Sequence, residues 1–272
     1  MFLFSLFLTG AVFLLILAGG LVTSHDAGLA VPDWPLSYGQ AFPPMVGNIF
    51  WEHGHRMIAG TVGILTLILA VWIQAAEKRL WLKRLGWIAF GAVVLQAILG
   101  GLTVIYLLPA PVSIFHACLA QTFFCLVIAI TFFLKMPYGM AGSFSQFKRI
   151  SYLTMAVIYA QLILGAMVRH THSHHAVIAH IVLAFAVVIH VFMLAGRIMR
   201  ALPGSALFKP AAGIGILTVI QFFLGIGSFV LTRMMEQGYA PSKAAVIFTA
   251  AHQTNGAAIL GTSVLIALMV SR

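Results

Sequence analysis

The sequence predicts an all-α integral membrane protein in which eight transmembrane helices form two pseudo-symmetric four-helix bundles. The first observation behind this prediction is composition: of 272 residues, 62% are hydrophobic and only 7% are charged. Soluble domains average about 25% charged residues, so an ordinary soluble enzyme, a disordered chain and a nucleic-acid-binding protein are excluded. The second observation is a set of matched histidines on alternate predicted helices.

Eight segments are long enough to cross a bilayer, which requires about 20 mostly apolar residues. The first segment has no basic residue before it and no convincing cleavage site after it, so we expect a retained helix rather than a removed signal peptide. The predicted spans are 2–23, 52–74, 87–108, 112–134, 150–169, 175–196, 210–232 and 244–270.

The basic residues indicate how these spans are oriented. Most of them lie in the connections 75–86, 135–149 and 197–209, which together with Arg272 hold 11 of the 15 Lys and Arg residues. Cytoplasmic loops of membrane proteins carry such an excess. The net charge of +10 therefore reflects orientation, and the sequence predicts a multi-pass cell-membrane protein with both termini in the cytoplasm.

Four histidines recur near the outer ends of the second, fourth, sixth and eighth spans. Each is followed four residues later by Ala or Gly, on the same helix face, which leaves room for a flat, bulky group. Two histidines that face each other across a four-helix bundle are typical of bis-imidazole haem. The four are His55, His116, His180 and His252.

This repeat predicts two similar halves, residues 1–134 and 150–272, joined by the cytoplasmic segment 135–149. Each half would hold one haem-sized site toward the outer leaflet. Arg56, Arg169 and Arg233 lie at outer helix ends and are candidate partners for haem propionates, since Arg suits carboxylates.

Other interpretations of these histidines stay open at this point. A single intramembrane His often bonds only a neighbouring helix, and zinc or copper sites also use His. The matched set of four favours haem over both. In the second half, His174 and His175 compete with His180 as the ligand.

Glu52 makes the two halves chemically unequal. It lies three residues before His55, on the same helix face, and it is the only acid close to any of the four histidines. Such a carboxylate is a candidate catalytic group that accepts a proton or stabilises positive charge. The alternative is a structural partner for Arg56 or a charge near the helix N-terminus.

These motifs together resemble the haem A synthase family of cytochrome oxidase assembly proteins. The resemblance rests on Glu52-x-x-His55-Arg56, on Gly28 to Pro35 with its Pro-Asp-Trp-Pro string, and on Gly100-Gly101-Leu102-Thr103-Val104. It implies that the N-terminal half binds substrate haem O through His55 and His116, and that the C-terminal half binds a permanent haem b through His180 and His252. It also implies oxidation of the C8 methyl of haem O to a formyl group through a hydroxymethyl intermediate.

The resemblance also implies partners. They are haem O, the lipid bilayer, the farnesyltransferase that produces haem O, and an electron donor. The donor's identity, the oxygen source, the haem occupancy of each half and the oligomeric state, including a homo-oligomer, stay open. An alternative function is a two-haem b-type membrane cytochrome that carries electrons from quinol, which needs the same four histidines and no substrate.

The chain departs from the family pattern in one place. Many bacterial members carry a cysteine pair that flanks the Pro-Asp-Trp-Pro string, whereas Val31 and Ser37 stand at these positions here. A mechanism or a redox control that needs a thiol pair in this loop is therefore not expected.

Overall fold

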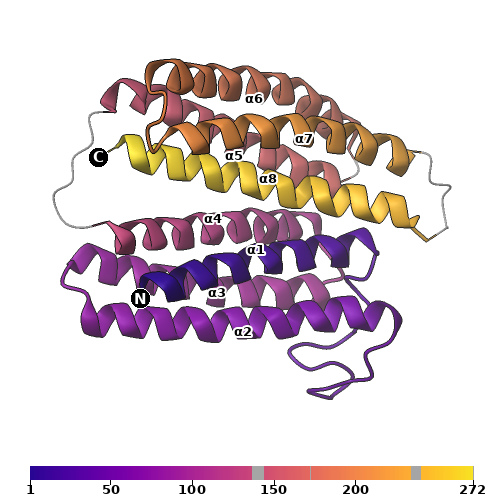
Figure 1. Ribbon diagram of the computed structural model, residues 1–272. Coiled ribbons are helices and arrows are strands. Elements are labelled where there is room, and N and C mark those ends of the chain that lie inside the picture. The colour runs from indigo at the N-terminus through magenta and orange to yellow at the C-terminus, as the bar shows by residue number, and fades with distance from the viewer. Residues whose placement is uncertain (137–143, 172, 234–239, 272) are drawn as a thin grey trace.

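The chain folds into eight long α-helices. The computed structural model describes residues 1–136, 144–171, 173–233 and 240–271, and no strand occurs among them. Each helix is long and apolar enough to cross a membrane, so the predicted all-α membrane fold is confirmed. The helices are α1 (Phe2–Ser24), α2 (Gly47–Ala76), α3 (Leu80–Ile105), α4 (Ala110–Lys135), α5 (Lys148–Thr171), α6 (His174–Ala201), α7 (Phe208–Arg233) and α8 (Lys243–Val270), with a short 3-10 turn at Ser145–Phe147 before α5 (Figure 1).

Several helices are longer at their charged ends than the hydropathy pattern predicts. Helix α3 begins at Leu80 rather than near residue 87, and α6 ends at Ala201 rather than near residue 196. Lys83, Arg84, Arg197 and Arg200 are therefore helical residues and not loop residues. Hydropathy marks only the part of a helix that faces hydrocarbon, whereas long basic side chains let a helix continue into the polar zone.

The helices pack as two rings of four. In the first ring α1, α2, α3 and α4 each contact the next helix, and α1 also contacts α4; helices α5 to α8 repeat this arrangement. The two sets lie one above the other in Figure 1. Each set has its own apolar core, with Leu8 and Phe123 fully buried in the first and Leu194 and Ile214 in the second. The predicted linker 135–149 connects α4 to α5 along the chain, and its residues 137–143 lie outside the described residues.

Helix α8 joins the two rings. It contacts α1 and α4 of the first ring as well as α5 and α7 of its own, and 56% of its most apolar stretch is buried, against 11% for α7. A β-carbon at Gly261 would lie 2.8 Å from Ile128 Cδ1 and 2.9 Å from Phe124 Cε1, both on α4. Glycine therefore allows the close approach of α8 and α4, as small residues do between membrane helices.

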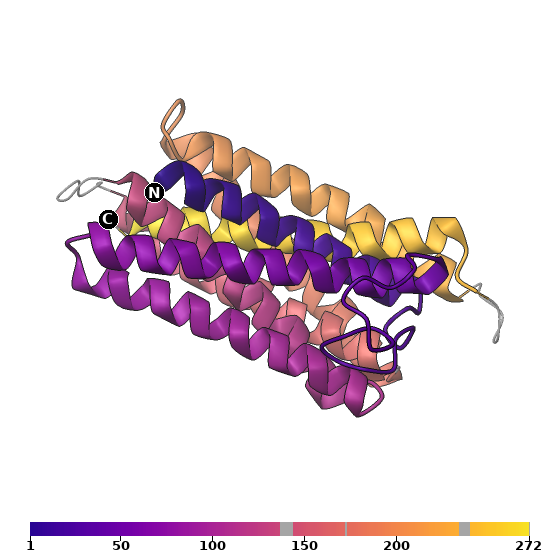
Figure 2. The same ribbon diagram turned by 90° about the horizontal axis from the view of Figure 1, so that it is seen from below.

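Both ends of the described chain lie at the same end of the molecule, because an even number of helices returns the chain to the side on which it began (Figures 1 and 2). The longest connection, residues 25–46, lies at the opposite end, which we call the loop end. Figure 2 shows that this connection folds back beside α2 and α3.

Candidate functional site

Each of the four predicted ligand histidines packs against a glycine of the preceding helix. A β-carbon at Gly19, Gly100, Gly165 or Gly225 would lie 3.1, 3.4, 3.2 or 3.0 Å from Cε1 of His55, His116, His180 or His252, respectively. The contact repeats from α1 and α2 through α7 and α8. Of these glycines only Gly100 was singled out from the sequence, and the role of all four behind the rings follows from the structure.

Glutamines one turn before three of these glycines support the histidine helices from the neighbouring helix. The side-chain amides of Gln96, Gln161 and Gln221 donate to the backbone carbonyls of His116, His180 and His252 at 2.9, 2.9 and 3.1 Å. At the equivalent place in α1 the residue is Leu15. The first repeat therefore lacks this support for its histidine.

Each of the four histidines has a buried ring nitrogen that can bind a ligand. Among the described residues, Nδ1 of His55, His116, His180 and His252 is buried without a hydrogen-bond partner. Native proteins pair nearly all such buried atoms, and the choice between the two ring nitrogens is one of assignment. The structure therefore leaves acceptor capacity at all four matched positions.

His180 and His252 face each other closely. Their ring centroids are 6.2 Å apart with an interplanar angle of 70°. An imidazole nitrogen lies about 2 Å from a first-row metal, so two imidazoles across one metal have ring centres roughly 6 Å apart. Such a pair fits haem iron, whose remaining ligands come from the porphyrin.

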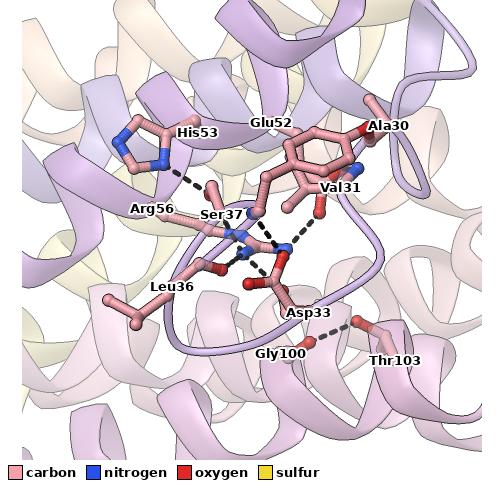
Figure 3. A network of polar contacts seen from close by, with 11 residues as sticks. Ala30, Val31, Asp33, Leu36, Ser37, Glu52, His53, Arg56, Gly100 and Thr103 are labelled. Atoms are coloured by element: carbon pink, nitrogen blue, oxygen red, sulfur yellow. Dashed lines mark hydrogen bonds and ion pairs between the residues drawn. The ribbon is translucent and has the colours of Figure 1, made fainter. Parts of the chain in front are cut away.

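The buried carboxylate of Glu52 fastens the long connection to α2. One oxygen accepts a hydrogen bond from the Val31 backbone at 2.9 Å, and the other pairs with Arg56 at 2.5 Å (Figure 3). Arg56 in turn donates to the carbonyls of Asp33 and Leu36 at 2.8 Å. Both oxygens of Glu52 are therefore engaged by protein groups in this structure.

A second fastening joins Ser37 to His53, a residue that the sequence pattern did not single out. A hydrogen bond of 2.7 Å connects Ser37 Oγ and His53 Nδ1, and Arg56 also reaches Ser37 Oγ at 3.4 Å. Val31 and Ser37 are both fully buried. Hydrogen bonds to α2 thus hold the two positions in this chain.

Asp33 organises the tip of the connection. Its carboxylate accepts the backbone N–H groups of Tyr38 at 2.6 Å and Gly39 at 2.8 Å. Hydrogen bonding to the charged form lowers a carboxyl pKa, and the bond from Gly39, followed by that from Tyr38, holds the pKa of Asp33 below its ordinary value. The tip is therefore a closed turn at neutral pH.

The remaining predicted residues are placed as follows. The described hydrogen bonds and the ion pair of Arg56 are made to the long connection and to Glu52. Arg169 is half-buried in the last turn of α5. Arg233 ends α7, and its side chain lies outside the described part of the chain. His174 and His175 are exposed in the first turn of α6, whereas His180 is the one that faces His252.

Comparison with known proteins gives a consistent set of relatives. The cytochrome oxidase assembly protein family matches residues 45–178. The heme A synthase of Exiguobacterium sibiricum is 30% identical over 184 residues, which is 64% of this chain and 60% of that protein. The heme A synthase of Alkalihalophilus pseudofirmus is 26% identical over 257 residues, which is 82% of this chain and 84% of that protein.

The family match covers the two halves unequally. The heme A synthase of Roseobacter denitrificans is 36% identical over 138 residues, or 46% of this chain and 36% of that protein, and the chain spans only about 60% of the length of the first relatives. The family match includes Glu52, His55 and His116 but ends before His180 and His252. The family match therefore does not reach the C-terminal pair.

Proposed function

Because the chain belongs to the haem A synthase family, we propose that it oxidises the C8 methyl of haem O to a formyl group in haem A biosynthesis, through a hydroxymethyl intermediate. The observation that carries the proposal is the fourfold set of histidines, each packed on a glycine and each with an unpartnered buried ring nitrogen. The relatives named heme A synthase support the same pathway.

The two halves receive different roles in this proposal. His55 and His116 would hold the substrate haem O, and His180 and His252 would hold a permanent haem b. The missing glutamine support behind His55, where Leu15 stands, fits a site whose ligand must leave as product. The paired centroids of His180 and His252 fit a site with a resident cofactor.

Haem iron supplies the redox chemistry when it is bound, and the residues of the chain position and enclose it. Conversion of a methyl to a formyl group breaks two C–H bonds and is a four-electron oxidation of the methyl carbon, so it needs an oxidant from outside the chain and a side chain near the methyl that can exchange protons. Glu52 is the catalytic candidate, because it is the only acid inside a helix among the described residues and lies three residues before His55. We propose that it accepts a proton or stabilises positive charge at the oxidised methyl.

The membrane supplies both substrate and orientation. Haem O carries a long farnesyl tail, so it would enter the bundle laterally from lipid, and the farnesyltransferase that makes it is the proposed donor protein. We place the chain in the cell membrane with both termini in the cytoplasm. Lys83, Arg84, Arg197 and Arg200 support this orientation, because they lie on helices α3 and α6 toward the end that holds the termini.

Extracted-haem chromatography of the full-length protein tests the proposal. The chain is expressed in cells that make haem O and no haem A, and the pigments are extracted and compared with an optical spectrum of the purified protein. We expect haem A to appear together with haem b. Haem b alone in both sites would refute the proposal and favour a two-haem b-type cytochrome that carries electrons from quinol.

Single substitutions of the ligands test the assignment of the halves. Replacing His180 or His252 by Ala should remove the haem b spectrum. Replacing His55 or His116 by Ala should lower haem A production more than haem b retention. The reverse pattern would exchange the roles of the two halves.

A further inference from the structure

The Pro-Asp-Trp-Pro string and the second glycine of the α3 pair meet in the structure, although the proposed function uses neither. A β-carbon at Gly101 would lie 2.8 Å from Cδ2 of Trp34 and 3.0 Å from both Cε2 and Cε3. These three atoms belong to the six-membered ring of the indole. The ring therefore lies flat on the bare backbone of Gly101, in space that any other side chain would fill.

This contact places the indole beside the N-terminal histidine pair. Gly100, the residue before Gly101, carries the ring of His116, whose Cε1 would lie 3.4 Å from a Gly100 β-carbon. Trp34 and His116 thus pack on consecutive residues in the last turns of α3. Figure 3 shows the connection passing in front of α3 at Gly100 and Thr103.

The backbone around Trp34 is fixed to the helix that carries the other histidine. Arg56 follows His55 directly and donates to the carbonyls of Asp33 and Leu36, which flank Trp34, at 2.8 Å each. The Trp34 segment is therefore held by Arg56, which follows His55 on α2, and its indole packs on Gly101, which follows Gly100 on α3. Trp34 remains 39% exposed, so the Gly101 contact leaves part of the ring uncovered.

In the C-terminal half, neither position that corresponds to Gly101 is a glycine. At the positions that correspond to Gly101, α5 carries Ala166 and α7 carries Ile226. In α1 the corresponding residue is Gly20, which is approached by the side chain of Gln253 of α8, with Gln253 Cδ 3.3 Å from a Gly20 β-carbon. Among the glycines of the described residues, only Gly101 is approached by an aromatic ring of a loop.

We propose that Trp34 is a substrate-contacting residue of the His55 and His116 site, which closes its loop end over a flat, apolar macrocycle, and that Gly101 provides the space for the indole. The inference rests on the proposed function for the class of ligand. An indole face suits a porphyrin because aromatic rings stack in offset geometry with a gain of about 0.5–1.5 kcal/mol beyond burial, which is about two- to tenfold in affinity.

Haem titration of the full-length protein tests this inference without turnover. Haem b and haem O are added separately to purified protein, and the Soret change that disappears in the His55→Ala variant is taken as binding to the N-terminal site. We expect Trp34→Ala to weaken this binding by about three- to tenfold, Trp34→Phe to weaken it less, and Gly101→Ala to resemble Trp34→Ala because the added methyl displaces the indole. Haem b retained by His180 and His252 should not change.

Trp87→Ala is the matched control, since Trp87 lies near the start of α3, the helix that carries Gly101, and its exposure of 42% is close to the 39% of Trp34. Unchanged affinity in Trp34→Ala, an equal loss in Trp87→Ala, or no His55-dependent binding at all would overturn the inference. If Trp34→Ala does not fold, Trp34→Phe and Gly101→Ala decide in the same way. A chain that binds haem in a Trp34-dependent manner but makes no haem A would uphold this inference and refute the proposed function.

Discussion

The distances between the four glycines and the histidine rings predict how strongly each Gly→Ala substitution weakens haem binding. In Gly225→Ala the new β-carbon would sit 3.0 Å from His252 Cε1, about 0.4 Å inside the 3.4 Å at which ordinary contact begins. Overpacking of a tight site costs about 1–3 kcal/mol, and so small a displacement belongs at the lower end. About 1 kcal/mol corresponds to roughly fivefold weaker retention of haem b.

The other three glycines set the order of the effect. Gly165→Ala would place its β-carbon 3.2 Å from His180 Cε1, so we expect about a two- to threefold loss of haem b by the same arithmetic. In the N-terminal half, Gly19→Ala at 3.1 Å should weaken haem O binding more than Gly100→Ala at 3.4 Å. The order follows from the distances alone and does not depend on which redox chemistry the sites perform.

The assay is haem b content per protein, with the low-spin optical spectrum as a second readout of axial ligation. Gly213→Ala on α7 is the control, because nothing lies within 4 Å of its β-carbon. Both substitutions raise helix propensity, so a loss confined to Gly225→Ala cannot come from a weaker helix. Equal haem content in the two variants, with unchanged spectra, would refute the reasoning.

Three further predictions concern the fastened connection. Glu52→Gln keeps an acceptor for the Val31 N–H and should retain the folded connection but lose haem A production by tenfold or more, whereas a normal rate in pigment analysis would show that Glu52 is not catalytic. Arg56→Lys loses the fork in which one guanidinium nitrogen donates to two loop carbonyls while the other pairs with Glu52, and it should make the connection more sensitive to limited proteolysis, with haem b content as the unaffected control. Because the pKa of Asp33 is lowered, its stabilisation of the turn is complete above the ordinary value of about 3.9 and is lost as the pH falls through the folded-state pKa. Exchange protection of the Tyr38 and Gly39 amides should fall over that range, and protection already lost at pH 6 would contradict this assignment.

The predicted number of helices, their approximate places and the histidine repeat did not require the structure. Apolar runs of about 20 residues have few alternatives in a bilayer, because every backbone polar group must be satisfied within the segment. The helix ends were predicted less well: Lys83 and Arg197 lie inside helices, since basic side chains reach the polar zone from a continuing helix.

The contacts around the candidate sites were partly foreseeable. The spacing of Glu52, His55 and Arg56 predicted a shared face on one helix, and the alternative of a Glu52–Arg56 pair is what the structure contains. The pairing of Ser37 with His53, by contrast, joins residues 16 positions apart through an irregular loop. Loop geometry of this kind has no periodicity from which a contact can be predicted.

By itself, the sequence determined that this protein is an eight-helix membrane protein with four matched histidines and one acid beside them, since hydrophobic length and helical periodicity are local properties. Only the tertiary structure decided which glycine carries which histidine, that His180 rather than His174 or His175 faces His252, and that Trp34 lies on Gly101. These contacts join separate helices and a loop, so they depend on how the helices pack, which no local pattern specifies.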